Sequence, residues 1–176
     1  MIFTETKLKG AYVIDPERIE DERGFFARMF CEQELKEHGI EFRVRQGNVS
    51  MNSARGTLRG MHYQAAPYEE AKIVRCTRGA LHDVIVDMRP ESPTFRQYAS
   101  VVLTADNHRV LYVPKRVAHG FLTLEDNTEV SYLISEFYHP EAVRGVRHND
   151  PAFGIKWPEP VRVIMERDRN YPDFKG

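Results

Sequence analysis

Short β-rich runs alternate with turns over most of the chain. The runs cover residues 72–76, 80–87, 97–103, 109–113, 120–124 and 128–137, and each is dominated by β-branched, aromatic or other apolar residues. Gly, Pro, Asn and Asp recur between them. Many short strands separated by closely spaced turns predict an all-β sandwich or barrel.

Helical patterning is limited to short stretches. The clearest one spans residues 31–38, and Gly39 follows it as a suitable C-terminal stop. The tail from residue 157 onward is irregular and polar. No internal repeat, low-complexity tract or linker interrupts the chain, so we expect residues 1–176 to form one domain.

The segment 46–64 carries the most informative pattern. Much of it alternates polar with apolar or small residues, as a strand with one wet face does. The polar positions hold amides, a hydroxyl, a guanidinium and an imidazole, namely Gln46, Asn48, Ser50, Arg59, His62 and Gln64. Side chains in such a row are expected to point into a ligand cavity at the mouth of a barrel. Arg59 and His62 are an odd number of positions apart, so a bulge near Gly60 is expected if both face that cavity.

Composition sets the broad class of the protein. The chain has 176 residues, of which 41% are hydrophobic and 29% charged, enough for one domain with a real core. A net charge of -1 argues against binding nucleic acid or an anionic membrane through bulk charge. No apolar segment is long enough to span a bilayer, and residues 1–10 lack a signal pattern. Cys31 and Cys76 do not make a disulfide framework, so a reduced cytoplasm is the expected compartment.

Ordered motifs along nearly the whole chain resemble those of a known family. They comprise residues 21–26 (DERGFF), 46–64, 72–75 (KIVR), 84–89 (VIVDMR), 118–121 (AHGF), 138–141 (YHPE), 149–151 (NDP), 155–158 (IKWP) and 166–168 (ERD). The chain thereby resembles the dTDP-4-dehydrorhamnose 3,5-epimerases, which are nucleotide-sugar epimerases. The resemblance implies a cupin-like jelly-roll barrel with a few short helices, a homodimer and a nucleotide-diphosphate 4-keto-sugar as substrate. It implies neither a metal nor an organic cofactor.

Epimerisation beside a ketone needs a base, stabilisation of the enolate, and an acid on the opposite face of the sugar. The resemblance assigns the base to His62 with Asp168 behind it, and the acid to Tyr132. Lys72 would lie near the ketone, where an ammonium could stabilise the enolate oxygen. Three of these residues also have a purely structural interpretation: His62 as a barrel histidine, Tyr132 as a packed strand tyrosine, and Lys72 as an exposed lysine at the start of a strand.

Further residues are expected to hold the substrate. Arg23 and Arg59 are candidates for the diphosphate, because guanidinium forks match phosphate oxygens. The resemblance adds a set of polar and aromatic side chains: Gln46, Asn48, His119, Tyr138, Arg167 and Arg28. His119 could instead be a turn residue whose imidazole bonds to the backbone.

Arg28 and Val143 depart from the family pattern. Both stand where the family carries a glutamate associated with nucleotide recognition. A guanidinium only donates hydrogen bonds, so Arg28 cannot accept one from a thymine imide. A GDP- or CDP-linked sugar is therefore an alternative substrate. Leu133 replaces a lysine that many relatives carry after the tyrosine, which leaves open whether one or two centres are inverted.

Three other functions fit parts of the pattern. A metal-dependent cupin needs clustered His and Glu ligands, and Glu69 or Glu70 with His119 could complete such a set, but the amide of Gln64 is a poor ligand. A sugar isomerase would share the proton abstraction and differ in where the proton returns. A non-catalytic sugar-nucleotide-binding module is less consistent with the presence of both His62 and Tyr132. An epimerase of deoxysugar or surface-polysaccharide synthesis is the function that the resemblance favours.

Overall fold

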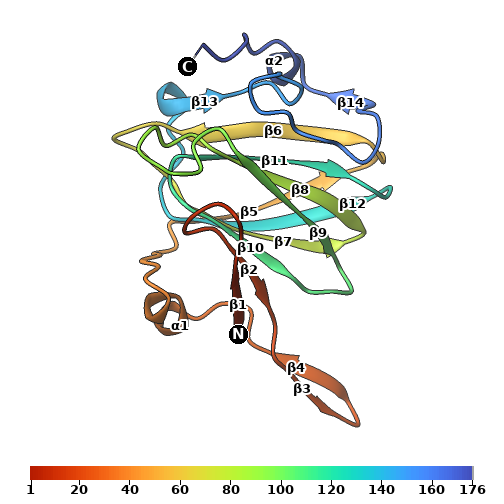
Figure 1. Ribbon diagram of the computed structural model, residues 1–176. Coiled ribbons are helices and arrows are strands. Elements are labelled where there is room, and N and C mark those ends of the chain that lie inside the picture. The colour runs from red at the N-terminus through yellow and green to blue at the C-terminus, as the bar shows by residue number, and fades with distance from the viewer. Residues whose placement is uncertain (176) are drawn as a thin grey trace.

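Two β-sheets packed face to face form the body of the molecule (Figure 1). The computed structural model describes residues 1–175. The first sheet has the order β1 (Ile2–Glu5), β2 (Tyr12–Asp15), β10 (Val110–Val113), β7 (Lys72–Arg78), β12 (Thr128–Ile134) and β5 (Gln46–Asn52). The second has the order β13 (Val143–Gly145), β6 (Thr57–Gln64), β11 (Val117–Thr123), β8 (Ala80–Asp87) and β9 (Tyr98–Thr104), with β14 (Val163–Ile164) paired to β6. The predicted all-β, cupin-like class is confirmed.

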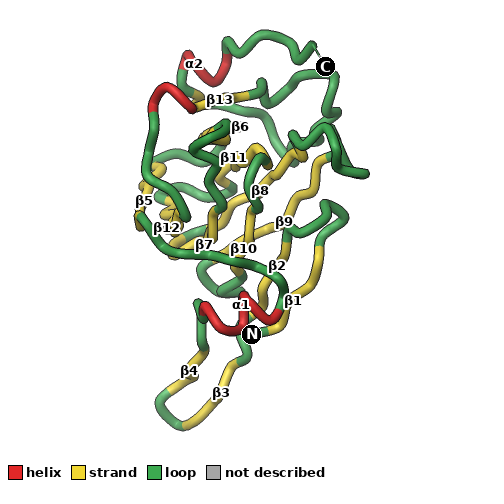
Figure 2. The backbone as a smooth tube through the Cα atoms, turned by 90° about the vertical axis from the view of Figure 1, so that its left-hand side faces the viewer, coloured by secondary structure: helices red, strands yellow, loops and turns green. Residues whose placement is uncertain are grey.

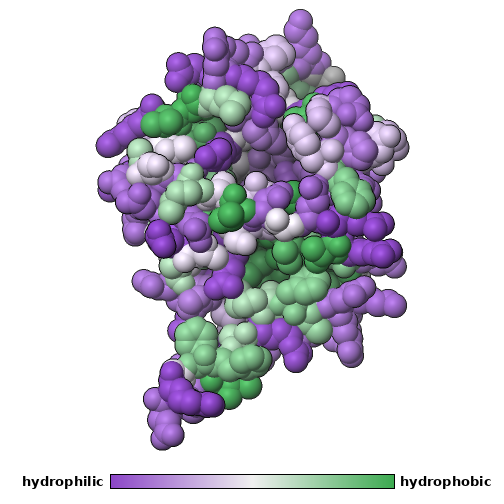
Figure 3. Space-filling model, turned by 180° about the vertical axis from the view of Figure 1, so that it is seen from behind, coloured by the Kyte–Doolittle hydropathy of each residue, from purple (hydrophilic) through white to green (hydrophobic). Residues whose placement is uncertain are grey.

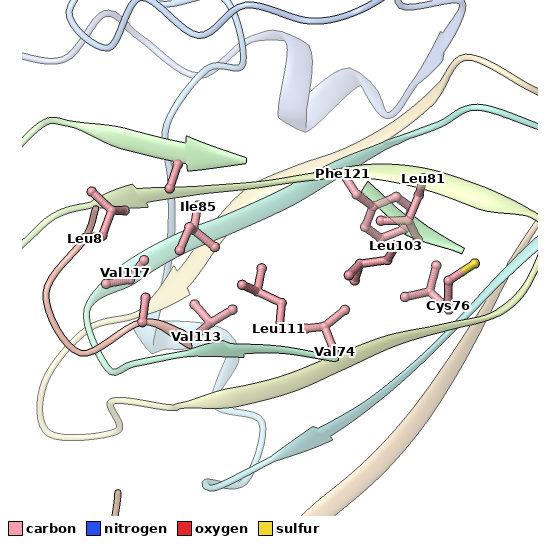
Figure 4. Packing of buried hydrophobic residues seen from close by; sticks show 13 residues of the cluster. Leu8, Val74, Cys76, Leu81, Ile85, Leu103, Leu111, Val113, Val117 and Phe121 are labelled. Carbon is pink, nitrogen blue, oxygen red and sulfur yellow. The ribbon is translucent and has the colours of Figure 1, made fainter. Parts of the chain in front are cut away.

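The main core lies between the two sheets (Figure 4). Val74 on β7 and Leu111 on β10 come from the first sheet, while Leu81 on β8 and Leu103 on β9 come from the second. All four are at most 1% exposed. Burying an aliphatic side chain of this size contributes roughly 1.5–3 kcal/mol, so this layer fixes the distance between the sheets.

A bulge in β6 sets the direction of its side chains. On β11, His119 lies opposite His62 and Phe121 lies opposite Arg59, so two steps on β11 match three on β6. The extra residue lies at Gly60–Met61, and Gly60 has a φ of 118°, which favours glycine. The predicted bulge is therefore confirmed, and it turns both Arg59 and His62 toward one side of the sheet.

The helices are few and short, as expected. They are α1 (Glu32–Glu37), the 3-10 helix η1 (Pro140–Ala142) and α2 (Glu166–Arg169). Helix α1 confirms the prediction for residues 31–38, and Leu35 anchors it against a second apolar cluster. No helix in residues 1–175 has the length and apolar character needed to cross a membrane.

The C-terminal tail is more ordered than its sequence suggests. The prediction of an irregular tail was wrong for β14 and α2, which both lie against β6. Trp157 and Phe174 pack on a third apolar cluster that includes Met61 and Phe153. Tertiary contacts rather than local periodicity hold this segment in place.

A separate hairpin projects from the body. Within residues 1–175, strands β3 (Arg18–Asp21) and β4 (Gly24–Ala27) pair only with each other, and they extend away from the end that carries α2 (Figures 1 and 2). Ile19 and Phe26 are both 67% exposed. Figure 3 shows hydrophobic side chains gathered on this hairpin above a hydrophilic tip.

Candidate active site

A cavity of about 310 Å³ opens between the two sheets, beneath the C-terminal segment. Its walls come from both sheets and from residues 163–168. The first sheet contributes Ser50, Lys72 and Tyr132; the second contributes Thr57, Leu58, Arg59, His62, His119 and Phe121; the C-terminal segment contributes Val163, Ile164, Met165 and Asp168. The segment 46–64 thus supplies much of the polar lining, as its alternation predicts.

His62 and Asp168 form a hydrogen-bonded pair in this cavity. The Nε2 atom of His62 lies 2.7 Å from Oδ1 of Asp168, and the backbone N–H of Gly60 donates to Oδ2 at 3.2 Å. Burial raises the pKa of Asp168, but the hydrogen bond from His62 and the other favourable contacts outweigh it, so the pKa lies below its ordinary value. Asp168 is therefore an ionised carboxylate at neutral pH.

The pairing determines which ring nitrogen of His62 can act as a base. An ionised carboxylate only accepts hydrogen bonds, so Nε2 carries the proton that it donates to Asp168. The neutral ring then has its lone pair on Nδ1. If Nδ1 takes up a proton, the carboxylate stabilises the resulting imidazolium.

Tyr132 borders the cavity from the other sheet. It lies on β12 of the first sheet, whereas His62 lies on β6 of the second. Burial raises the pKa of the Tyr132 phenol, so the hydroxyl stays protonated at neutral pH and can donate. An imidazole and a phenol thus lie on opposite walls of one cavity.

Lys72 is buried rather than exposed at the start of its strand. It is 8% exposed, and its Nζ lies 2.9 Å from Oε1 of Glu70 and donates to the carbonyl of His62 at 3.3 Å. The carboxylate of Glu70 offsets the cost of burying the ammonium. Glu70 was not predicted to be the partner of Lys72.

Arg59 is held at the edge of the cavity by neighbours on β5. Its Nε donates to Oδ1 of Asn52 at 2.7 Å, and Nη2 donates to the carbonyl of Met51 at 3.4 Å. Asn52 is buried and also donates to the carbonyl of Thr128. Pairing with neutral groups leaves the positive charge of Arg59 available to an anion.

His119 is a strand residue, so the alternative of a turn histidine bonded to backbone was wrong. It lies on β11 directly opposite His62, and its Nε2 is 2.6 Å from Oδ1 of Asp83 on β8. Cross-strand neighbours point to the same face of a sheet, which brings both imidazoles to the cavity. Both histidines that line the cavity are thus paired with an aspartate.

Other predicted residues lie at the periphery. Asn48 is exposed on the edge strand β5, opposite Tyr132, and Gln46 is the first residue of the same strand. Tyr138 is 60% exposed. Arg167 is the second residue of α2, and its Nη2 lies 3.4 Å from Nε2 of His62. None of the four lines the cavity.

Arg23, Arg28 and Gln64 do not reach the cavity of their own chain. Arg23, at the tip of the hairpin, pairs with Asp21, and Arg28 donates to Oε1 of Glu34 at 2.9 Å. The hairpin lies at the opposite end of the molecule from α2 (Figures 1 and 2). Gln64 is buried and binds backbone groups of Tyr68, Phe137 and His139, so it fixes loops instead.

Comparison with known proteins decides the family. The family model described as dTDP-4-dehydrorhamnose 3,5-epimerase matches residues 5–176. The chain belongs to this family. A dTDP-4-dehydrorhamnose 3,5-epimerase from Methanothermobacter thermautotrophicus is 43% identical over 176 residues, covering 98% of this chain and 94% of the relative.

Solved structures of the same family share the fold over nearly the whole chain. The enzyme from Elizabethkingia anophelis aligns with a TM-score of 0.96 at 37% identity, covering 99% of this chain and 96% of its own. The enzyme from Bacillus anthracis, solved with TDP and PPi, aligns with a TM-score of 0.93 at 39% identity, covering 98% and 99%. The enzyme from Legionella pneumophila, in complex with dTDP-4-keto-L-rhamnose, gives 0.87 at 36%, covering 95% and 89%.

Family membership places the chain among the isomerases that act on sugar nucleotides. The alternatives of a metal-dependent cupin and a non-catalytic binding module are not favoured. Residues 1–175 contain no group of three or more His, Cys, Asp and Glu side chains arranged to hold a metal ion.

Proposed function

We propose that this chain epimerises a dTDP-linked 4-keto-6-deoxy sugar at C3 and C5, the carbons that flank the ketone. One observation carries the proposal: His62 and Tyr132 line the same cavity from opposite sheets, with Asp168 bonded to the imidazole. Inversion requires proton removal on one face of the ring and delivery on the other. A sugar bound between the two walls would present one face to each group.

The proposed reaction begins when Nδ1 of His62 removes the proton next to the ketone. The electron pair of the broken C–H bond moves into an enolate, whose oxygen the Lys72 ammonium stabilises. The Tyr132 hydroxyl then delivers its proton to the carbon from the far side. Solvent takes the proton from His62 and restores the one on Tyr132, so no oxidant or reductant is consumed.

The base of the nucleotide is proposed to be thymine. The similar enzymes from Bacillus anthracis and Legionella pneumophila were solved with TDP and with a dTDP-sugar, respectively. Arg28 was the reason to consider a GDP- or CDP-linked sugar. Its guanidinium forms an ion pair with Glu34, whose carboxylate also binds the N-terminal amine of Met1. Calorimetry with dTDP, GDP and CDP tests this point. We expect a clear preference for dTDP, and equal or tighter binding of GDP or CDP would contradict it.

A homodimer is proposed as the working form. The β3–β4 hairpin exposes Ile19, Phe25 and Phe26 and presents Arg23 far from its own cavity. Docking this hairpin on a second copy would bury the apolar side chains and bring Arg23 toward the partner's diphosphate. Phe26→Asp should then shift the mass measured by light scattering to that of a monomer. An unchanged dimer would contradict the role of the hairpin.

The reaction itself is tested by incubating the chain with a dTDP-linked 4-keto-6-deoxy sugar in D2O. We expect NMR to show deuterium at C3 and C5 and inversion of both centres. Exchange at one carbon alone would restrict the activity to a single centre, and no exchange would refute the function.

The reduced cytoplasm is the proposed compartment, supported by the free thiols of Cys31 and Cys76.

A further inference from the structure

Asp83 on β8 is a fully buried carboxylate with a single hydrogen-bond partner. Its exposure is 0%, and Oδ1 accepts from Nε2 of His119 at 2.6 Å. The other oxygen, Oδ2, has no partner among the described residues. Burying a charged group is costly unless it is paired. Within residues 1–175, the hydrogen bond with His119 is the one interaction that offsets this cost, so the role of Asp83 is to be sought in His119.

Asp87, four positions further along the same strand, shows what a structural carboxylate looks like in this fold. It is equally buried, yet it accepts hydrogen bonds from the side chains of Arg89, Ser92 and Thr94 and from the backbone N–H of Arg89. These bonds hold the loop that follows β8. Asp83 caps no loop and binds no backbone group among the described residues, so the two aspartates have different roles.

The bond from His119 determines the chemistry that its ring offers to the cavity. The carboxylate only accepts, so Nε2 carries the proton and the neutral ring has its lone pair on Nδ1. His119 lines the cavity next to His62, and its side chain is 10% exposed. Nδ1 makes no hydrogen bond to any described residue, so it is free to accept one from a ligand.

We propose that Asp83 is a positioning residue that fixes His119 in the Nε2–H tautomer, so that Nδ1 accepts a hydrogen bond from a hydroxyl group of the bound sugar. The proposal rests on the proposed function, because it takes the ligand to be a nucleotide-linked sugar. It makes the site selective for a sugar that has a hydroxyl donor at this wall. A group that only accepts hydrogen bonds would meet the lone pair of Nδ1 and bind more weakly.

The tautomer is measured by NMR of the full chain labelled with 15N-histidine. His119→Gln identifies the His119 signals among those of the seven histidines. We expect the wild-type ring to be protonated on Nε2 and not on Nδ1 at a pH where it is neutral. In Asp83→Asn the amide can donate or accept, so both tautomers should be populated. Asp87→Asn is the matched control and should leave the tautomer of His119 unchanged.

Binding of the unreactive probe dTDP-glucose, and of analogues that each lack one ring hydroxyl, tests the selectivity. Removing the hydroxyl that donates to Nδ1 should weaken binding to the wild-type chain about fivefold to tenfold, the effect of one hydrogen bond. The same removal should cost less than about twofold in Asp83→Asn. A nonadditive effect of this kind is not expected if Asp83 only supports the fold.

Two results would overturn the proposal. One is a wild-type His119 protonated on Nδ1, which can be seen even if Asp83→Asn does not fold. The other is an equal penalty for the missing hydroxyl in the wild type and in Asp83→Asn. Neither measurement depends on turnover, so failure of the proposed epimerase reaction, seen as absent deuterium uptake, is a separate result.

Discussion

Asp168 is the residue that links the C-terminal segment to the chemistry of the cavity. It is 2% exposed, accepts from His62 and from the Gly60 backbone, and lies on the short helix α2. Its lowered pKa keeps it ionised at neutral pH. In the proposed mechanism His62 becomes an imidazolium, and a neutral amide at position 168 could not stabilise that charge.

Asp168→Asn should therefore lower kcat by about 100-fold or more, with a much smaller change in KM, because the loss falls on the transition state. Steady-state kinetics with the dTDP-linked keto sugar measures this. Asp173→Asn is a suitable control, since Asp173 lies in the same tail and pairs with Arg147 rather than with His62. A wild-type kcat in Asp168→Asn would show that His62 needs no carboxylate.

Residues of the candidate site were predictable where they lie close together in the sequence. Arg59 and His62 belong to one strand, and their shared direction followed from the expected bulge. The ion pair of Glu70 with Lys72 was missed because Glu70 was considered only as a metal ligand. The bond of Asp83 with His119 was missed because the two residues are 36 positions apart in the chain. Neither has a sequence signal beyond being an acidic residue near a strand.

At the scale of elements, the close contact between β6 and β11 shapes the cavity wall. A Cβ atom on Gly60 would lie 2.5 Å from Cα of Gly120 and 2.7 Å from the carbonyl of His119. These are backbone atoms and cannot move aside cheaply. The contact keeps His62 and His119 next to each other on the same face.

Gly60→Ala should destabilise the fold by at least about 2 kcal/mol, because a steric clash adds to the strain of a positive φ. Urea unfolding followed by circular dichroism measures the loss. Gly10→Ala separates the two effects, since Gly10 has a φ of 79° but no atom within 4 Å of an added Cβ. Equal losses in the two variants would mean that the β6–β11 contact is not tight.

Strand positions after residue 72 were predicted well, whereas the N-terminal strands β1 to β4 were not predicted and the C-terminal elements were predicted poorly. Strand β8 has the predicted bounds, and β7, β9, β10 and β12 differ by a few residues, because each buries a regular apolar pattern. The tail has no such pattern. Bonds such as Trp157 Nε1 to the carbonyl of His148 hold it, and these depend on the finished sandwich.

At the scale of the whole molecule, the packing of the two sheets sets the distance between the two walls of the cavity, because each sheet forms one wall. Part of its stability depends on pH through Asp87. Burial alone would raise the pKa of Asp87, but hydrogen bonds from Arg89, Ser92 and Thr94 hold it at about 2. The ordinary value is 3.8, so the folded state favours the ionised form.

The stability from this pKa shift is fully present above about pH 4 and is lost as the pH falls toward 2. The pH-dependent part should amount to about 2 kcal/mol. Urea unfolding of the wild type and of Asp87→Asn from pH 6 to pH 2 measures it. We expect the gap between them to narrow below pH 4, and a constant gap down to pH 2 would contradict the assignment.

The proposed epimerisation requires His62 and Tyr132 to act from opposite walls of one cavity. Deuterium exchange and net inversion, followed together by NMR in D2O, separate the two roles. His62→Asn should abolish both exchange and inversion while nucleotide binding persists. Tyr132→Phe should still exchange deuterium at the carbon next to the ketone but invert it much more slowly. Wild-type exchange in His62→Asn, or undiminished inversion in Tyr132→Phe, would contradict the account.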